Sequence, residues 1–244
     1  MLWEHSSAGR ASALQAEGHR FEPYCSHQKS TSSEVLFSLS RNMKKKKGEI
    51  AMIYRFIFKG YPKKPKNQKN KDMKLKENNN AKNVSIFEFE NMVFMYAESK
   101  KENINPTDIV EAELIPYPDG SEWENMSEVF HYSMPQSDES WERTQKKTPK
   151  LRVNYVRHGK ISSYIYYHFQ YQEEYPCDGD KYGIIFHSGD LLVFYTESPT
   201  EFAPKYKGLL DTKNSPLHDE WAKLMENEHF DTKFGGWKLV ERIL

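Results

Sequence analysis

Beyond position 52, hydrophobic residues come in short runs separated by polar stretches, and most runs have the composition of β-strands. Aromatic and β-branched residues, which favour strands, dominate the segments 53–58, 85–98, 151–157, 161–171, 182–197 and 237–243. Turn-forming residues interrupt two of these segments, Glu90-Asn91 in the first case and His187-Ser-Gly-Asp190 in the second. The segments 85–98 and 182–197 are therefore predicted to be β-hairpins.

Two further segments space their hydrophobic residues three and four positions apart, which is typical of one face of an α-helix. Each segment begins with a Glu-Trp pair and follows one of the predicted hairpins. The residues with this spacing are Trp123, Met126, Val129 and Phe130 in the first segment, and Trp221, Leu224 and Met225 in the second. The sequence therefore predicts a helix after each hairpin.

The second strand of each hairpin repeats one pattern. MVFMYAES ends at Ser99 and LLVFYTES ends at Ser198, so that Tyr96 and Glu98 correspond to Tyr195 and Glu197. With a strand before each hairpin and another after each helix, residues 52–158 and 159–244 are both predicted to be β-β-β-α-β units. Two such units would bury their uncovered sheet faces against each other. The predicted fold class is α+β, with two halves forming a pseudo-dimeric α+β barrel.

This arrangement resembles the ferredoxin-like dimeric α+β barrel superfamily, fused in tandem. Residues 182–225 also resemble the L-rhamnose mutarotase family, through a Tyr-x-Ile strand, a Leu-Leu hairpin partner ending in Glu197, and Trp221-x-x-x-Met225. The resemblance implies that Tyr182 and Trp221 line a sugar pocket. Members of that family carry a functional His on a helix between their first two strands. Here we expect only the loop 173–180 at that position, so the His role is not carried over.

The first 51 residues are expected to be a translated transfer-RNA gene and leader, non-native and disordered. Permitted codons for Ser6–Ala13 spell the D arm of a transfer RNA, those for Arg20–Pro23 the core of its TΨC arm, and those for Cys25–Gln28 its CCA end. Permitted codons for Trp3–His5 are complementary to the nucleotides just before the CCA end, as in the acceptor stem of a transfer RNA. The alternative is a disordered protein tail; in either case the segment is excluded from fold reasoning.

The start of the working protein is expected at Met52. Codons for Lys47-Gly48-Glu49 permit a ribosome-binding site just upstream, which indicates a bacterial source and a misannotated start. Met43 is the competing start, but it would add a lysine run without a structural role. Neither the N-terminus of the sequence nor the stretch after Met52 carries the pattern of a secretory signal.

Composition narrows the class of protein. The chain has 244 residues and 35 basic against 35 acidic side chains, but residues 52–244 hold 27 and 30, a net charge of −3. A mildly acidic body argues against nucleic acid as the main partner. No apolar run approaches the roughly 18 residues of a membrane helix. Two cysteines, Cys25 and Cys177, leave no disulfide framework, which suits the cytoplasm.

The segment Lys63–Asn83 contains eight lysines and many asparagines but almost no hydrophobic residues. Such a composition cannot bury surface, so it is predicted to be a flexible loop between strands. A patch for an anionic partner is the alternative, although the segment lacks the interleaved aromatic residues typical of nucleic-acid binding.

Candidate site residues come first from the predicted strand 161–171. Strand alternation would place Tyr164, Tyr166 and His168 on one face, which is polar yet aromatic. Rings offer contact area and polar tips fix orientation, so this face suits a cavity for a small polar molecule. A half-exposed sheet face shielded by tyrosines is the alternative.

The repeated Tyr-x-Glu pairs are the second candidates. Tyr195 and Glu197 share one sheet face, as do Tyr96 and Glu98, and a buried Glu beside Tyr suits acid–base chemistry. Their presence in both halves favours a structural role at the strand ends, such as hydrogen bonding to backbone amides. Trp123 and Trp221 are expected to be core anchors or pocket walls, and His131 and His229 helix caps.

The sequence contains no dinucleotide fingerprint, phosphate loop, nucleophile elbow or metal-binding spacing, so neither a cofactor nor a metal is predicted. The first hypothesis is a bacterial cytosolic protein, monomeric because of the duplication, that binds a small polar molecule between its halves through Tyr164, Tyr166, His168, Tyr182, Tyr195 and Trp221. The second is a mutarotase-like isomerase with Tyr166, His168, Tyr182 or Glu197 as proton carriers. An interaction protein that uses the lysine-rich loop ranks third.

Overall fold

The computed structural model describes residues 52–63, 73–77, 80–210 and 220–244. Residues 1–51 lie outside these ranges, so their interpretation as a translated transfer-RNA gene stays a prediction. Most of the lysine-rich segment Lys63–Asn83 also lies outside them. The described end of that loop differs from the expectation, because Met73 is buried and strand β2 (Lys74–Leu75) pairs with β5 (Val110–Glu111).

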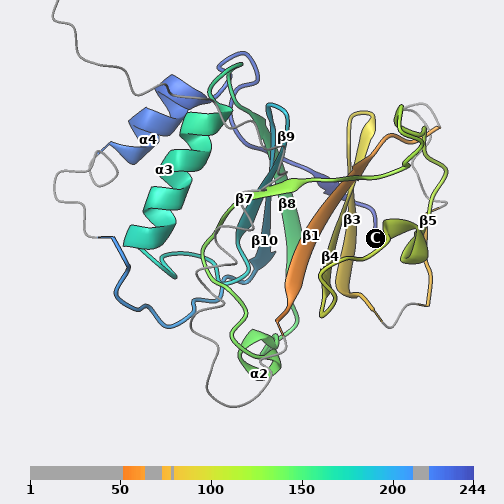
Figure 1. Cartoon of the computed structure of the whole chain (residues 1–244), viewed down its shortest axis with the longest axis horizontal. Coiled ribbons are helices and arrows are strands. Elements are labelled where there is room, and N and C mark those ends of the chain that lie inside the picture. Colours follow the sequence, from red (N-terminus) through yellow and green to blue (C-terminus); the bar gives the residue numbers. More distant parts are fainter. Residues whose placement is uncertain (1–51, 64–72, 78–79, 211–219) are drawn as a thin grey trace, which may run out of the picture. The chain divides into compact units, whose positions relative to one another are not determined.

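Two five-stranded sheets, in which all pairings are antiparallel, form the body of the described protein (Figure 1). The first has the order β12-β3-β4-β1-β6 and the second β11-β8-β10-β9-β7. The strands of the first sheet are β1 (Tyr54–Gly60), β3 (Lys82–Phe89), β4 (Met92–Ser99), β6 (Glu124–Asn125) and β12 (Glu241–Arg242). Those of the second are β7 (Ser127–His131), β8 (Thr148–Tyr155), β9 (Ile184–Ser188), β10 (Leu191–Ser198) and β11 (Lys238–Leu239).

Helices are few in the described ranges and the longest packs on the second sheet, on the same side as α4 (Figure 1). They are the short helix η1 (Pro106–Asp108), α2 (Asp138–Trp141), α3 (Ile161–Glu174), α4 (Trp221–Lys223) and the π-helix η2 (Leu224–His229). The fold is therefore a mixed α+β structure built mostly of antiparallel sheets. Within the described ranges, no helix combines the length and the hydropathy needed to span a bilayer.

The two predicted hairpins are confirmed, and they correspond to each other residue by residue. Met95 pairs with Ile86 in the first, just as Phe194 pairs with Ile185 in the second, 99 positions later in each case. The neighbouring strands correspond as well, since Ile57 of β1 pairs with Tyr96, and Leu151 of β8 pairs with Tyr195.

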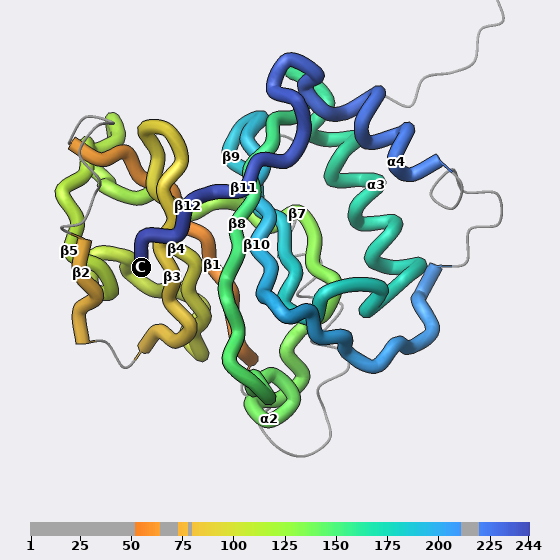
Figure 2. The backbone as a smooth tube through the Cα atoms, turned by 180° about the vertical axis from the view of Figure 1, so that it is seen from behind, coloured from red at the N-terminus to blue at the C-terminus, as the bar shows by residue number. Residues whose placement is uncertain are grey.

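Each sheet also receives a strand from a segment that begins in the other sheet. After β6 the chain leaves the first sheet at Met126 and continues as β7 of the second; after β11 it leaves the second sheet at Val240 and continues as β12 of the first. Figure 2 shows β11 beside β8 and β12 beside β3. At each crossing point a backbone amide donates to the equivalent strand, Met126 to Ile57 O and Val240 to Leu151 O, both at 2.9 Å. The two crossings have the same geometry.

One hydrophobic core lies between the sheets and takes residues from both. At its centre the rings of Tyr96 and Tyr195 stack with centroids 3.6 Å apart and planes 6° from parallel. The buried members of this core are Ile57, Phe87, Met92, Phe94, Tyr96, Met126, Leu151, Val153, Ile184, Phe186, Leu191, Val193, Tyr195 and Val240. The crossing residues Met126 and Val240 belong to it, so strand exchange and core packing depend on each other.

The prediction of a strand at 161–171 was wrong, because this segment is helix α3. The residues that face the sheet, Ile161, Tyr164, Ile165, His168 and Tyr171, recur every three or four positions. Because tyrosine and isoleucine also favour strands, composition outweighed this helical period in the prediction. The helix takes the place of the predicted strand, and residues 175–180 after it form an irregular connection toward β9.

The helix predicted from Trp123 was also wrong, since this segment forms strands β6 and β7. Its hydrophobic residues are three apart for two reasons that have nothing to do with a helix. The chain changes sheets at Met126, and the register of β7 shifts between Glu128 and Phe130, as in a β-bulge. The β-β-β-α-β order therefore does not hold, and the two separate sheets do not close into the predicted barrel.

Replacing Leu151 with Ala tests the shared core. The side chain is fully buried between the sheets, and its loss is expected to reduce the free energy of unfolding by about 2–5 kcal/mol in urea denaturation. The matched control is Leu239→Ala in β11, whose side chain is 66% exposed and whose truncation should change stability by no more than about 0.5 kcal/mol. Equal losses in the two variants would contradict the description of the core.

Candidate functional site

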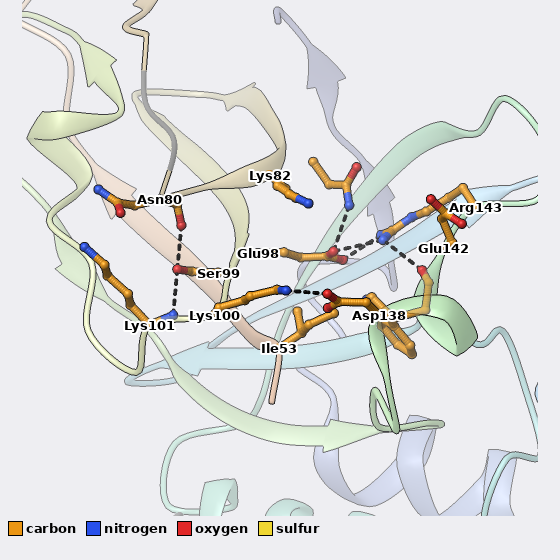
Figure 3. Close-up of a pocket in the computed structure, with 12 residues that line it drawn as sticks. Ile53, Asn80, Lys82, Glu98, Ser99, Lys100, Lys101, Asp138, Glu142 and Arg143 are labelled. Atoms are coloured by element: carbon orange, nitrogen blue, oxygen red, sulfur yellow. Dashed lines mark hydrogen bonds and ion pairs between the residues drawn. The ribbon is translucent and has the colours of Figure 1, made fainter. Parts of the chain in front are cut away.

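Arg143 joins the two sheets at the ends of β4 and β10. It belongs to the connection between β7 and β8, just after helix α2. Its Nη1 and Nη2 donate to the two carboxylate oxygens of Glu98 at 2.8 and 2.6 Å (Figure 3). Its Nε and Nη2 donate to the carboxylate oxygens of Glu197 at 3.1 and 2.5 Å. One guanidinium thus binds two carboxylates in a bidentate manner, which is the geometry that gives Arg its specificity for such groups.

Each carboxylate receives further hydrogen bonds from its own half. Tyr96 Oη donates to Glu98 at 2.7 Å and Tyr195 Oη donates to Glu197 at 2.9 Å, so the stacked tyrosines and the two glutamates form one network. Glu98 also accepts a hydrogen bond from Asn83 Nδ2 at 2.8 Å. The glutamate side chains are only 3% exposed and that of Arg143 is 14% exposed, so this charged network is largely shielded from water.

Contacts within the network favour the charged forms of Glu98 and Arg143. Burial alone would raise the pKa of Glu98, but the hydrogen bonds and charge of Arg143, with smaller contributions from Tyr96 and Asn83, lower it overall. Burial also opposes the charge of Arg143, yet the two glutamates raise its pKa. Burial and the neighbouring carboxylates raise the pKa of Tyr96 and Tyr195 well above 10.0, so both phenols stay protonated.

Aromatic rings hold the guanidinium in place. Its carbon lies 4.1 Å from the ring centroid of Tyr182 and 5.9 Å from that of Trp141. These two rings contact each other edge to face, with centroids 5.1 Å apart. The guanidinium carbon of Arg55 also lies 5.1 Å from the centroid of the Trp141 ring. Tyr182 Oη donates to the backbone carbonyl of Glu142. The connection that carries Arg143 is therefore fixed to the segment just before β9 as well as to both glutamates.

A pocket of about 560 Å³ lies beside Arg143, at the start of β1 and β3 and the end of β4 (Figure 3). Most of its lining is polar: Ile53, Asn80, Lys82, Asn83, Glu98, Ser99, Lys100, Lys101, Asp138, Trp141, Glu142 and Arg143. Ser99 Oγ links two of the walls, because it donates to the Asn80 carbonyl and accepts from the Lys101 amide. Lys100 pairs with Asp138 across the opening.

The indole of Trp141 is the unusual member of this lining. The residue is 2% exposed, and its Nε1–H has no hydrogen-bond partner among the described residues. A buried N–H without an acceptor costs roughly 1–3 kcal/mol. Trp141 is among the residues that line the pocket, so a buried donor without a partner among the described residues lies next to this wall.

The predicted site residues fall into two groups. Tyr182, Tyr195 and Glu197 come together around Arg143. Tyr164, His168 and Trp221 lie instead between α3, α4 and the second sheet, in the cluster that also contains Phe130. Tyr166 points away from both groups and is 61% exposed, because a helix and not a strand carries it.

In the second group His168 is almost fully buried. Its Nδ1 donates to the Tyr164 carbonyl at 2.9 Å, and its ring contacts Trp221 with centroids 4.9 Å apart. Burial lowers the pKa of His168 to about 3, so the imidazole is neutral at physiological pH. The Tyr164 hydroxyl is buried without a hydrogen-bond partner among the described residues. In the described ranges no three His, Cys, Asp or Glu side chains are placed to hold a metal ion.

Sequence reasoning missed Arg143, Trp141 and Asn83. It recognised the repeated glutamates and expected backbone amides as their partners, whereas the partner is a cation from a distant connection. Two glutamates that become buried on sheet faces need a partner of opposite charge. That requirement, together with a Trp and an Arg in the polar segment before β8, was the signal available.

Comparison with known proteins adds no relative. No family model matches this chain, and neither a curated protein nor a solved structure matches it. The function must therefore be argued from the geometry of the two groups.

Replacing Arg143 with Met tests the network. Removing the cation leaves two buried carboxylates unpaired, and the variant is expected to lose about 3–5 kcal/mol of stability at pH 7 in urea denaturation. Lys100→Ala serves as the control, since this pair is half exposed and its loss should cost no more than about 1 kcal/mol.

The difference in stability between the wild type and Arg143→Met is predicted to depend on pH. In the wild type the lowered pKa of Glu98 contributes stability above the ordinary value of 4.5, and this contribution is lost as the pH falls through the lowered pKa. In Arg143→Met the buried carboxyl resists ionisation, so that variant loses stability as the pH rises. The gap between the two proteins should therefore narrow below pH 4.5, and a gap that stays constant with pH would count against the network.

Proposed function

We propose that this protein binds a small polar molecule in the pocket beside Arg143. The observation that carries the proposal is the buried indole N–H of Trp141, a donor in the pocket wall whose acceptor is not supplied by the described residues. The volume of about 560 Å³ falls within the range of about 300–1,000 Å³ that small-molecule sites occupy. Fixed polar groups in a pocket lined mostly by polar residues favour a ligand with several hydroxyl, amide or carboxylate groups.

The walls of this pocket are held in position before any ligand arrives. Arg143 fixes Glu98, and Asn83 is fixed to the same carboxylate from a left-handed backbone conformation, φ 52°. Asn tolerates this conformation better than most residues, and it lies where the register between β3 and β4 shifts. Rigid polar groups reduce the entropy that binding costs, which supports a binding role.

We further propose that the two sheets arose by internal duplication of a ferredoxin-like unit. The second unit would begin with β8, ahead of the boundary at residue 159 predicted from the sequence. It runs β8-α3-β9-β10-α4-β11 along the chain, with the sheet order β11-β8-β10-β9, and this agrees with the β-α-β-β-α-β plan. The first half follows the same sheet order through β6-β1-β4-β3 without the two helices. Because the exchanged strands and the shared core lie within one chain, a monomer is the proposed state. The buried free thiol of Cys177 agrees with a reducing cytoplasm.

Thermal-shift screening of the full chain against sugars, amino acids and small carboxylic acids tests the binding proposal. A ligand at 100 times its Kd should raise Tm by about 5–10 °C, because it stabilises the folded state by about 2.7 kcal/mol. If no compound of the panel raised the Tm of the wild type, the proposal would be contradicted.

Trp141→Phe then locates the ligand. This variant keeps the ring but removes the N–H, and it should weaken binding about 5- to 10-fold in calorimetric titration, the effect of one net hydrogen bond. The matched control Trp221→Phe removes an indole N–H from the α3 cluster and should leave Kd unchanged. If Trp221→Phe weakened binding and Trp141→Phe left Kd unchanged, the ligand would bind at the α3 cluster instead.

A sugar mutarotase-like isomerase is the second candidate, favoured by one observation. Helix α3 lies between β8 and β9 and carries His168, so a helix with a His occupies the position where the resembling family has one. Tyr164 and Trp221 contact this His. Of the proposed proton carriers, Tyr182 and Glu197 belong to the Arg143 network and Tyr166 is exposed, which leaves His168. Its Nδ1–H is bound to a carbonyl, so Nε2 would accept the proton of a sugar hydroxyl.

Exchange NMR of the α and β anomers of L-rhamnose tests this candidate. The wild type should accelerate their interconversion, and His168→Gln should reduce the acceleration by about 10²- to 10⁴-fold, as expected for loss of a general base. His158→Gln is the control, because the His158 side chain is 99% exposed. Absence of acceleration by the wild type, or equal rates in the two variants, would reject the isomerase.

A further inference from the structure

Ser163 and His229 form a hydrogen-bonded pair beside the second group, where the ring centroids of His229 and Tyr164 lie 6.2 Å apart. Ser163 is the third residue of α3, and His229 is the last residue of the π-helix η2. Ser163 Oγ lies 2.8 Å from His229 Nε2. A serine hydroxyl in contact with an imidazole nitrogen is the starting arrangement for nucleophilic catalysis by serine.

The backbone around His229 determines which ring nitrogen is the base. His229 Nδ1 lies 2.9 Å from the Leu224 carbonyl oxygen, which can only accept, so Nδ1 carries the proton. In the neutral ring Nε2 then has a free lone pair, directed at Ser163 Oγ. The same oxygen lies 3.0 Å from the Lys160 carbonyl, so the hydroxyl proton has two acceptors available. The carbonyl of Leu224 thus orients the imidazole, as a third group must in such a pair.

The position of His229 is fixed by its surroundings. The residue is 1% exposed, and the ring of Tyr167 contacts it edge to face at 5.6 Å. The backbone N–H of Arg157 donates to the His229 carbonyl at 2.8 Å, and Arg157 Nε donates to the next carbonyl, that of Phe230, at 3.0 Å. Ser163 is only half-buried. The base is therefore shielded from water, while the residue that carries the hydroxyl reaches the surface.

The local electrostatics favour negative charge close to Ser163. It lies in the first turn of a helix of 14 residues, and the side chain of the N-cap residue, Lys160, makes no capping hydrogen bond. Amides of a first turn carry partial positive charge and have no partners within the helix. This feature is secondary, since the inference rests on the Ser163–His229 pair.

We propose that Ser163 and His229 form a nucleophilic site that cleaves small carboxylic esters. Ser163 Oγ attacks the ester carbonyl and forms an Oγ–C bond while its proton moves to His229 Nε2. The C–O bond to the alcohol breaks, and the leaving oxygen takes that proton. Water then attacks the acyl group and gives a proton to His229 Nε2; the Oγ–C bond breaks, Ser163 regains the proton, and the carboxylic acid leaves. The net reaction is ester plus water to acid plus alcohol.

p-Nitrophenyl acetate and the full chain provide the test. The wild type should release p-nitrophenolate faster than buffer, and a fluorophosphonate probe should add one mass equivalent at Ser163, identified by peptide mapping. Ser163→Ala should remove both the rate and the label. His229→Gln should reduce the rate by about 10²- to 10⁴-fold, the usual contribution of a general base.

Matched controls come from the same region. Ser162→Ala alters the exposed neighbouring serine, and His158→Gln alters an exposed histidine; both variants should keep the wild-type rate. A wild type that neither hydrolyses the ester nor takes the label would overturn the proposal, as would labelling at Ser162 instead of Ser163. The labelling result on the wild type decides even where His229→Gln does not fold. Since Arg143 and Trp141 take no part, failure here leaves the binding proposal intact.

Discussion

The contact between Arg143 and the two buried carboxylates of Glu98 and Glu197 is the interaction on which the arrangement of this molecule depends. The glutamates occupy equivalent strand ends in the two sheets, and the stacked phenols of Tyr96 and Tyr195 bring them together. Two carboxylates at such a place would repel each other in a medium of low dielectric. One guanidinium from the connection between the sheets neutralises part of this charge and ties both strand ends to the wall of the pocket.

Because the sheets exchange strands, the contact of Arg143 with the two glutamates can both hold the sheets together and form part of a binding pocket. Because β7 and β12 each complete the other sheet, the two halves share a core and cannot separate without losing backbone hydrogen bonds. The connection from β7 to β8 occurs only once in the chain. It therefore breaks the correspondence between the halves and places Trp141 and Arg143 at one end alone. The pocket beside Arg143 lies at the strand ends that this connection reaches.

The sequence was sufficient for features determined by neighbours in the chain. Both hairpins were predicted correctly, because Glu90-Asn91 and Ser188-Gly189-Asp190 are turn residues between strand-forming runs. The segment from Ile161 was misjudged, since its tyrosines favour a strand while burial every third or fourth residue favours a helix, and only packing on the sheet decides between them. The segment from Trp123 was misjudged because a crossing between sheets and a bulge imitate a helical period. Arg143 was missed because its partners lie 45 and 54 positions away.

The central claim is that a polar ligand binds beside Arg143 and satisfies the indole of Trp141. The most direct measurement is the indole ¹H–¹⁵N spectrum of the full chain during titration with a compound that stabilises it. The account predicts that the Trp141 proton moves downfield as it donates a hydrogen bond to the ligand, while the Trp221 resonance stays in place. Saturable binding that shifts Trp221 and leaves Trp141 unchanged would contradict it.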